Sequence, residues 1–326
     1  MHRYTLQAYA GLKSRYTCPQ CRHRQKTFKL YIDTRTNTPL ASHVGRCDRA
    51  DSCGYHYTPR EFFKATPGFV NLHAVAKAIS PKRSYNLMPH SLMQASMCNY
   101  SHNNFVYFLS RMFGRQKALS LAKKYNIGTA KHWPGANIFW QVDVQGNVRT
   151  GKIMLYNTQN CKRVKEPYNH IAWAHRLAGS SRLATVQTAN PQAKNFDLKQ
   201  CLYGEHLLAL DPWKPVAIAE SEKTAIIASE YKPQYIWLAA GSLDGLTADK
   251  CRILKNRTVT LYPDVNGYAK WQKKARLLNT YIPSATFTLS HQLETTATPN
   301  ERAQGVDIAD RWVGDLIREW MAERGS

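Results

Sequence analysis

The sequence predicts an α/β protein whose C-terminal part forms a parallel sheet, preceded by a mixed α+β central region and a small cysteine-rich N-terminal domain. After Pro215, short apolar runs alternate with segments of helical period. Such alternation is typical of a Rossmann-like parallel sheet with helices on its faces. Upstream, the turn signal Gln145-Gly146-Asn147 lies between two strand-like runs, and paired cysteines mark the N-terminal region. With 326 residues, the chain can bury a sizeable core.

The first expected element is a zinc ribbon between Tyr16 and Tyr57, with a strand over residues 27–33. Two cysteines separated by two residues can direct both thiolates to one ion, and a second pair completes a tetrahedron. The second pair is more widely spaced than usual, so His56 is an alternative ligand. A site closed by four protein ligands is structural, so we expect zinc to fold this segment without taking part in catalysis. The expected zinc ligands are Cys18, Cys21, Cys47 and Cys53.

The chain carries 45 basic and 22 acidic residues, a formal net charge of +23. A positive field of this size concentrates polyanions, so we expect a nucleic acid partner, with a solubilising surface as the alternative. Residues 1–60 alone hold eleven Lys and Arg against three Asp. This charge suits phosphate contacts on a single strand. Four aromatic rings of the ribbon would either stack on bases or pack within the ribbon: Tyr31, Tyr55, His56 and Tyr57.

The sequence predicts neither a membrane span nor a secretory signal. No apolar run approaches the ~20 residues needed to cross a bilayer. The N-terminus lacks the apolar centre of a signal peptide. We therefore expect a cytoplasmic protein with no membrane partner. Thiols stay reduced in that compartment, so clustered cysteines indicate a metal rather than disulfides.

The region between ribbon and parallel sheet divides in two. Residues 67–100 contain prolines and few acids, which predicts a basic linker after a ribbon domain of residues 1–66. Residues 101–214 are expected to form a mixed subdomain that begins with helices and continues with a hairpin of strands at 138–143 and 148–156. Beyond the hairpin, three basic side chains would line a nucleic-acid channel or belong to a solvated loop: Lys162, Arg163 and Lys165.

Residues 215–326 are expected to form the parallel sheet domain. The predicted strands are 216–219, 235–239, 258–262 and 284–289. The predicted helices are 221–230, 247–254, 267–279 and 308–323. Glu220 closes the first strand and Asp264 follows the third, so both fall at the carboxyl edge of the sheet, with Asp307 and Asp310 further along the chain. Carboxylates gathered at one edge indicate a divalent cation and phosphodiester chemistry.

Three motifs of this region resemble the Toprim domain, in the order and spacing of that family. Glu220-Ser-Glu-Lys-Thr-Ala225 resembles the first Toprim motif in its phage and plasmid primase version. Leu261-Tyr-Pro-Asp-Val-Asn-Gly267 resembles the Asp-x-Asp motif, and Gly305-Val-Asp-Ile-Ala-Asp310 resembles the third acidic element.

The resemblance extends upstream to the core of DnaG-type primases. Tyr125-Asn-Ile-Gly128, the hairpin and Cys201-Leu-Tyr-Gly-Glu205 are similar to successive elements of that core. With the ribbon, the resemblance covers residues 16–60 and about 100–320. It is greatest to the short primase-like proteins of bacterial mobile elements and phages, which carry a ribbon and a Toprim domain without a helicase.

The resemblance implies a template-directed RNA polymerase that makes primers on single-stranded DNA from nucleoside triphosphates, using Mg²⁺ or Mn²⁺. Glu220, Asp264 and Asp307 would hold the metal, and Asp310 would support the site. Contacts with template or triphosphate would come from Lys152, Lys162, Arg163, Lys165, Lys223 and Asn266. The sequence has no Gly-x-x-x-x-Gly-Lys-Ser/Thr phosphate loop, so unwinding is expected from a separate replicative helicase.

Two residues depart from the family pattern. Ser221 replaces a glycine, and Asn266 stands where the family has its second Asp, which implies weaker binding of one metal ion. A catalytically weak single-stranded DNA-binding protein of a replication or mobilisation complex is therefore a competing hypothesis. A Toprim nuclease, which shares the acids but cuts strands, is a second one. Neither template preference nor the choice of ribo- or deoxynucleotides follows from the sequence.

Overall fold

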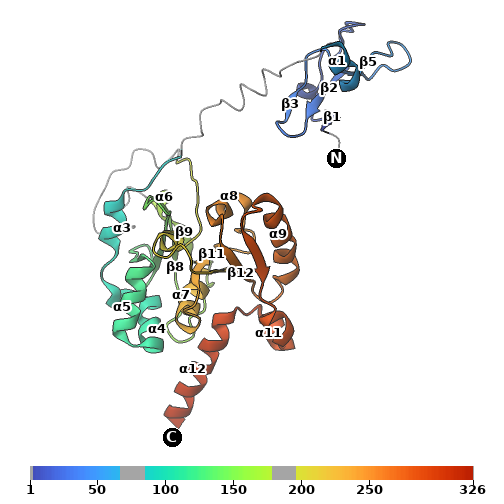
Figure 1. Cartoon of the computed structure of the whole chain (residues 1–326). Coiled ribbons are helices and arrows are strands. Elements are labelled where there is room, and N and C mark those ends of the chain that lie inside the picture. Colours follow the sequence, from blue (N-terminus) through green and yellow to red (C-terminus); the bar gives the residue numbers. More distant parts are fainter. Residues whose placement is uncertain (1–2, 67–84, 178–195, 326) are drawn as a thin grey trace. The chain divides into compact units, whose positions relative to one another are not determined.

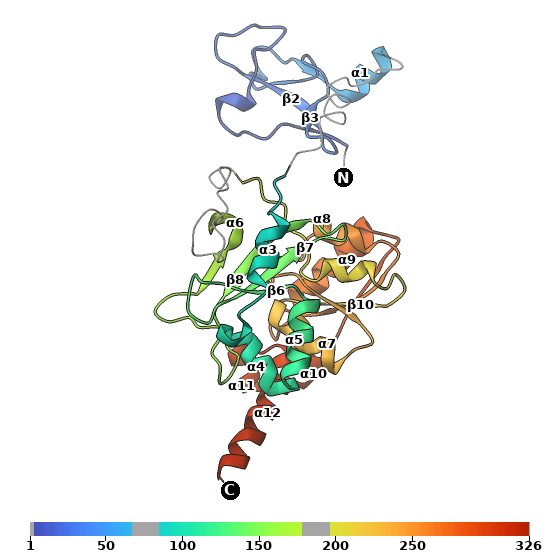
Figure 2. The same cartoon turned by 90° about the vertical axis from the view of Figure 1, so that its left-hand side faces the viewer.

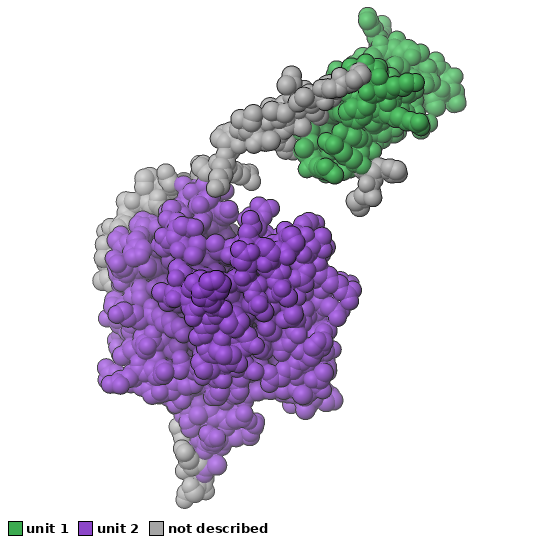
Figure 3. All heavy atoms as spheres, viewed as in Figure 1, with its two compact units in different colours: residues 1–84 green, residues 85–326 purple. Residues whose placement is uncertain are grey.

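The computed structural model describes residues 3–66, 85–177 and 196–325. The chain divides into two compact units, residues 1–84 and residues 85–326 (Figure 3). Each unit contains apolar clusters of its own, and the two are described separately below.

The N-terminal unit is a five-stranded antiparallel sheet (Figure 1). Its central strand is β2 (Phe28–Asp33), which agrees within one residue with the predicted strand. β2 pairs with β1 (Tyr4–Leu6), β3 (Thr38–Pro39) and β4 (Gly45–Cys47), and β4 pairs with β5 (His56–Tyr57).

One short helix, α1 (Pro59–Ala65), follows the sheet of the N-terminal unit. It begins at Thr58, which forms a capping box with Glu61. The apolar clusters of this unit are small: Phe28 and Leu30 pack beside cysteines, and Leu40, Val44 and Phe62 form a second group. Cores of this size stabilise little by themselves, so a bound metal is expected to contribute much of the folding free energy.

The second unit begins with helices packed on an antiparallel sheet. α4 (Asn104–Phe113) and α5 (Arg115–Lys124) are separated by Gly114, whose positive φ of +79° suits glycine. The sheet has the order β6-β7-β8-β9. Its strands are β6 (Ile127–Thr129), β7 (Asn137–Val142), β8 (Val148–Met154) and β9 (Ile171–Trp173). β7 and β8 form the predicted hairpin, and all their residues are buried because helices and loops cover both faces. A short helix, α6 (Ala174–Leu177), follows β9 and contacts β8.

Residues 85–100 differ from the sequence-based expectation of a linker. They contain α3 (His90–Ser96), whose Leu92 and Met93 are buried in one cluster with Trp140. The indole Nε1 of Trp140 donates a hydrogen bond to Oγ of Ser96 over 2.8 Å. This segment therefore packs on the central sheet, whereas residues 67–84 of the expected linker lie outside the described residues.

The second sheet of this unit is parallel throughout, in the order β11-β10-β12-β13. Its strands are β10 (Val216–Ala219), β11 (Ile236–Ala239), β12 (Thr258–Tyr262) and β13 (Thr286–Leu289), close to the predicted ranges. The chain leaves β10 toward β11, then crosses back to β12 and on to β13. The gap between the carboxyl ends of β10 and β12 is consequently the topological switch point of the sheet, where α/β proteins place their sites.

Helices cover both faces of the parallel sheet. α7 (Glu222–Tyr231) packs on β10 and β11, and α9 (Tyr268–Tyr281) packs on β13. In Figure 1, α7 and α9 lie on opposite sides of the strands. The helix predicted near 247–254 is shorter, because α8 (Ala248–Cys251) continues as a 3₁₀ turn at Arg252–Leu254.

Three helices close the chain. α10 (Gln292–Thr296) and α11 (Pro299–Gln304) were not predicted, although Thr298 and Glu301 have the spacing of a capping box. α12 (Ile308–Gly325) packs against α7 near its start. Trp320 in its later turns still contacts Phe108 and Arg111 of α4, and the end of the helix projects from the unit, as Figures 1 and 2 both show.

A continuous apolar core joins the central region to the parallel sheet. It includes Phe105 and Phe139 from the former and Ile218 and Leu261 from the latter. The predicted boundary between residues 214 and 215 thus crosses one core rather than a gap. Among the described residues, no helix is long and apolar enough to cross a membrane.

Candidate functional site

Glu220 and Asp264 meet at the switch point of the parallel sheet. Ala219 of β10 pairs with Tyr262 of β12, so the residues that follow these two strands emerge side by side. The backbone N–H of Asp264 donates a hydrogen bond to Oε1 of Glu220 over 3.1 Å. Gly267 completes this turn: a Cβ there would lie 2.5 Å from the same Oε1, so a larger residue would displace the Glu220 carboxylate. The structure therefore brings together two acids that the sequence predicted as metal ligands.

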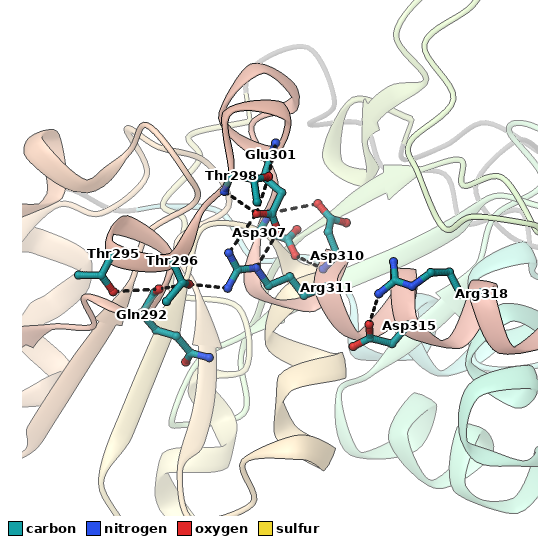
Figure 4. Close-up of polar contacts among 10 residues, drawn as sticks. All are labelled: Gln292, Thr295, Thr296, Thr298, Glu301, Asp307, Asp310, Arg311, Asp315 and Arg318. Atoms are coloured by element: carbon teal, nitrogen blue, oxygen red, sulfur yellow. Dashed lines mark hydrogen bonds and ion pairs between the residues drawn. The ribbon is translucent and has the colours of Figure 1, made fainter.

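Asp307 and Asp310 lie at the start of α12, where each caps the other. The N–H of Asp307 donates to Oδ2 of Asp310 over 3.0 Å, and the N–H of Asp310 donates to Oδ1 of Asp307 over 2.9 Å. Figure 4 shows this pair beside Arg311, which binds Glu301 of α11. The preceding residue, Val306, accepts a backbone hydrogen bond of 2.9 Å from Val265, so the helix start lies beside the turn that carries Asp264.

Lys223 of α7 reaches the same pair of acids. Its Nζ lies 3.0 Å from Oδ2 of Asp307 and also donates to Oδ1 of Asp310. Burial alone would lower the pKa of Lys223, but Asp307 and Asp310 outweigh burial and hold its pKa well above the usual value. Lys223 is therefore charged in the folded protein and neutralises part of the acidic cluster.

Neither Asp264 nor Glu220 forms a direct ion pair in the part of the chain that the structure describes, although Lys223 lies near the former and Lys274 near the latter. Burial, with Asp307 and Glu220 nearby, raises the pKa of Asp264 to about 9. Burial also raises the pKa of Glu220, although the N–H of Asp264 partly opposes it. Oδ1 of Asp264 is buried and has no hydrogen-bond partner in the described part of the chain. Two desolvated carboxylates with a free oxygen suit a hard divalent cation, since Mg²⁺ and Mn²⁺ take oxygen ligands and offset their repulsion.

Lys152 of β8 lies in a separate buried ion pair. Its Nζ is 3.1 Å from Oε2 of Glu222 and 2.8 Å from the carbonyl oxygen of Gly241. Sequence analysis named Lys152 but gave no role to Glu222, which stands two residues after Glu220 and is fully buried. The pair ties the central sheet to the start of α7 and so positions the neighbouring acids.

Three further predicted binding residues belong to the loop after β8. Lys162 and Lys165 are exposed in the loop after β8, and Arg163 between them is half-buried. Nζ of Lys162 is 3.5 Å from Oε1 of Gln304 at the end of α11, which places this loop next to the start of α12.

Asn266 is exposed and has a positive φ of +71°, a conformation that asparagine tolerates. Its Nδ2 donates to the carbonyl oxygen of Arg302 over 2.7 Å. The amide thus joins the turn after β12 to α11.

The second predicted metal site is the cysteine cluster of the N-terminal unit. The sulfur atoms of Cys18, Cys21, Cys47 and Cys53 lie within 4.8 Å of one another, and those of Cys18 and Cys53 are 3.7 Å apart. A tetrahedral Zn²⁺ with bonds of about 2.3 Å has S–S edges of about 3.8 Å, so these thiols fit the ion. His56, the alternative ligand, is outside the cluster and bonds to Oη of Tyr31 instead.

Thiol acidity in this cluster also suits a cation. A hydrogen bond from the N–H of His23 lowers the pKa of Cys21 to about 7, whereas burial raises that of Cys18 to about 11. Buried thiols become thiolates when a metal replaces their protons. The four cysteines therefore form a candidate zinc site.

The four aromatic rings, expected either to stack on bases or to pack within the ribbon, are engaged within the ribbon. Tyr31 stacks on His56, Tyr55 packs on Phe28, and Tyr57 contacts His43 and Phe62. Sequence analysis missed Tyr9, whose ring is 68% exposed and carries Arg15 above it at 5.0 Å. This ring borders an open hollow of about 590 Å³ whose lining also includes Arg24 and Lys26.

Solved structures similar to this chain are DnaG-type primase fragments. The primase fragment of the bacteriophage T7 primase-helicase has 11% identity and a TM-score of 0.35, covering 90% of this chain and 98% of that chain. The zinc-binding and RNA polymerase domains of the Aquifex aeolicus primase have 13% identity and a TM-score of 0.38, covering 97% and 80%. The DnaG catalytic core has 12% identity and a TM-score of 0.38, covering 70% and 80%.

Two family descriptions match the sequence itself. Residues 2–68 match the family described as a zinc beta-ribbon finger. No curated protein sequence matches the chain. Residues 103–265, half of the chain, match the family described as "Domain of unknown function (DUF6371)". The chain therefore belongs to this family.

Proposed function

We propose that the chain is a primase-like nucleotidyltransferase with a Toprim core, which binds single-stranded DNA and joins nucleoside triphosphates into short primers. The observation that carries the proposal is the meeting of Glu220 and Asp264 at the switch point of the parallel sheet, beside Asp307. Like charges buried together are unfavourable unless a cation joins them. This arrangement, together with the order of the acidic motifs, supports metal-assisted phosphoryl transfer.

In this proposal, Glu220, Asp264 and Asp307 are the residues that hold Mg²⁺ or Mn²⁺, and Asp310 supports Asp307 through their reciprocal hydrogen bonds. The ion would neutralise phosphate charge and activate the attacking hydroxyl. Burial of Glu220 and of Oδ1 of Asp264 strengthens each electrostatic contact.

The remaining predicted residues would contact substrate or support the site, and would take no part in the reaction itself. Lys162, Arg163 and Lys165 would contact triphosphate or template, since their loop lies next to the start of α12. Asn266 would orient the turn that carries Asp264 and could contact a nucleotide through its amide oxygen. Lys152 would act through Glu222 by holding β8 against the site.

Single-stranded DNA would be supplied by other proteins and held by this chain. The zinc ribbon would bring a basic surface to the template, with Arg15, Arg24 and Lys26 around an exposed tyrosine. A separate replicative helicase would expose the strand. The likeness of the motifs to those of mobile-element and phage primases suggests that such an element encodes the chain.

A second candidate is a DNA-binding protein with little turnover. It is favoured by Asn266, which presents a neutral amide where the motif has a carboxylate and which already bonds to Arg302. A site with fewer free charges holds metal less tightly.

Primer synthesis tests the proposal directly. The zinc-loaded chain is incubated with single-stranded DNA, labelled nucleotides and Mg²⁺ or Mn²⁺, in parallel with Asp264→Asn and the control Asp249→Asn, whose exposed acid pairs with Lys199 and Arg252 instead. We expect extended products with the parent and the control, and a loss of at least about a hundredfold in Asp264→Asn. Shortened DNA would mean a nuclease, and bound but unchanged DNA would mean the second candidate.

A further inference from the structure

Lys223 is the buried cation of the acidic cluster. Its side chain is 9% exposed and that of Asp307 is 8% exposed, so their ion pair of 3.0 Å is largely removed from water. The same ammonium binds Asp310. Lys223 also lies three residues after Glu220, in the first turn of α7. Its position relative to the first acidic motif is therefore set by the start of this helix.

The oxygens of the cluster divide into occupied and free ones. Asp307 uses Oδ1 for the N–H of Asp310 and Oδ2 for Lys223. Asp310 uses Oδ2 for the N–H of Asp307 and Oδ1 for Lys223. In contrast, Oδ1 of Asp264 has no partner among the described residues, and the hydrogen bond at 3.1 Å engages only Oε1 of Glu220.

We propose that Lys223 fills the position of a second metal ion, so that the site binds a single divalent cation, held chiefly by Glu220 and Asp264. This inference rests on the proposed function and refines its metal site. Asp307 then lies near the bound cation but stays paired with Lys223. It coordinates the cation directly only when this ion pair breaks.

Charge balance supports one cation rather than two. The four carboxylates and Lys223 carry a formal charge of −3 in their ionised states, which one divalent ion reduces to −1. A second divalent ion would have to displace a buried ammonium from two carboxylates or share them with it. Neither Lys270 nor Lys274 replaces Lys223, because both pair with Asp244.

The test is the number and affinity of ions bound before any substrate is added. Mn²⁺ is titrated into the zinc-loaded full chain, followed by calorimetry and by the paramagnetic resonance signal of free Mn²⁺. We expect one ion per chain in the parent, and in Lys223→Met either a second ion or at least about tenfold tighter binding, because removing a nearby positive charge favours a cation. Lys223→Arg should keep the parental behaviour.

Lys250→Met is the matched control. Lys250 is a half-buried lysine of the same sheet domain that bonds to Gln200 and to the carbonyl oxygen of Ala240, and it forms no ion pair with any of the four acids. Its replacement should leave the Mn²⁺ titration unchanged. If Lys223→Met binds the same number of ions with the same affinity as the parent, the inference is wrong.

A double variant covers the risk that Lys223→Met does not fold. Lys223→Met/Asp310→Asn keeps the formal charge of the cluster at −3 and frees Oδ2 of Asp307. It should fold and bind Mn²⁺ more tightly than the parent; parental or weaker binding would overturn the inference. Two ions in the parent would also overturn it while leaving the proposed function intact, whereas no ion in any variant would count against the proposed function as well.

Discussion

At the scale of single residues, the carboxyl group of Asp264 is the most strongly perturbed acid of the site. Burial and two neighbouring acids raise its pKa to about 9, from an ordinary value near 4. Between these values the folded chain retains a proton that the unfolded chain has released. Without a metal, stability is therefore expected to fall as pH rises through this range, because the native state binds more protons.

Asp264→Asn removes this titration. At pH 8, without added Mg²⁺ or Mn²⁺, the variant is expected to melt at a higher temperature than the parent, and the two should converge near pH 4, where both side chains are neutral. Thermal melting from pH 4 to pH 9 measures the difference, with Asp249→Asn as control. Added Mg²⁺ should raise the melting temperature of the parent more than that of Asp264→Asn. Parallel pH profiles for both proteins would contradict the assigned pKa.

Asn266 differs from the acids because its side chain has a structural partner. Asn266→Asp replaces the donor that faces the carbonyl oxygen of Arg302 with an acceptor. We expect the free energy of unfolding to drop by about 1 kcal/mol, measured by urea denaturation. Asn256→Asp is the matched control, since Asn256 is also exposed with a positive φ, of +63°. An unchanged stability together with tighter metal binding would instead place residue 266 among the metal ligands.

At the scale of elements, the ribbon and the sheet unit are stabilised by different means. The second unit has an extensive apolar core, whereas the ribbon has two small clusters, of which one surrounds its cysteines. A site of four thiolates can contribute on the order of 10 kcal/mol to folding. Removal of zinc should therefore destabilise the first unit and leave the stability of the second unit unchanged.

Cys18→Ser tests this division. Cys18 is fully buried, and its loss leaves three ligands, so we expect the zinc content after dialysis to fall from one ion per chain to nearly none. The ribbon should unfold while the unit of residues 85–326 keeps its melting transition. Cys98→Ser, which replaces an exposed cysteine outside the cluster, should retain zinc. A full complement of zinc in Cys18→Ser would disprove the ligand set.

At the scale of the whole molecule, the net charge of +23 is distributed over both units. In the first unit it includes Arg15, Arg24 and Lys26 around one hollow, and in the second it includes Lys162 and Lys165 on the loop after β8. Charges spread in this way suit a polyanion that contacts several parts of the chain.

Affinity for single-stranded DNA should consequently depend strongly on salt. Each phosphate contact is expected to contribute a slope of about −0.7 to log affinity against log salt concentration. Lys162→Ala/Lys165→Ala should make the slope less steep by up to about 1.4, if both side chains contact phosphates. Fluorescence anisotropy with a labelled oligonucleotide measures this, and a slope near zero for the parent would mean that the charge is only a solvated surface.

Much of the parallel sheet domain could be predicted because its signals are local. The apolar strands, and the acids Glu220 and Asp264 that follow two of them, are visible over a few residues. The same holds for Cys18 and Cys21, whose spacing alone predicts a shared metal. By contrast, the preceding prolines and the scarcity of acids predict a linker where α3 lies, although the burial of Leu92 in one cluster with Trp140 makes it part of the core.

The sequence by itself determined the order of the elements, the cysteine set of the ribbon and the acids at the strand ends, since periodicity and ligand spacing act within short stretches of chain. Only the tertiary structure decided which charges meet. Lys223, expected to face a nucleotide, lies against Asp307 and Asp310 from 84 or more residues away, and Lys152 is paired with Glu222. Such pairings depend on how separate elements pack, and burial then sets their strength, so no local pattern could reveal them.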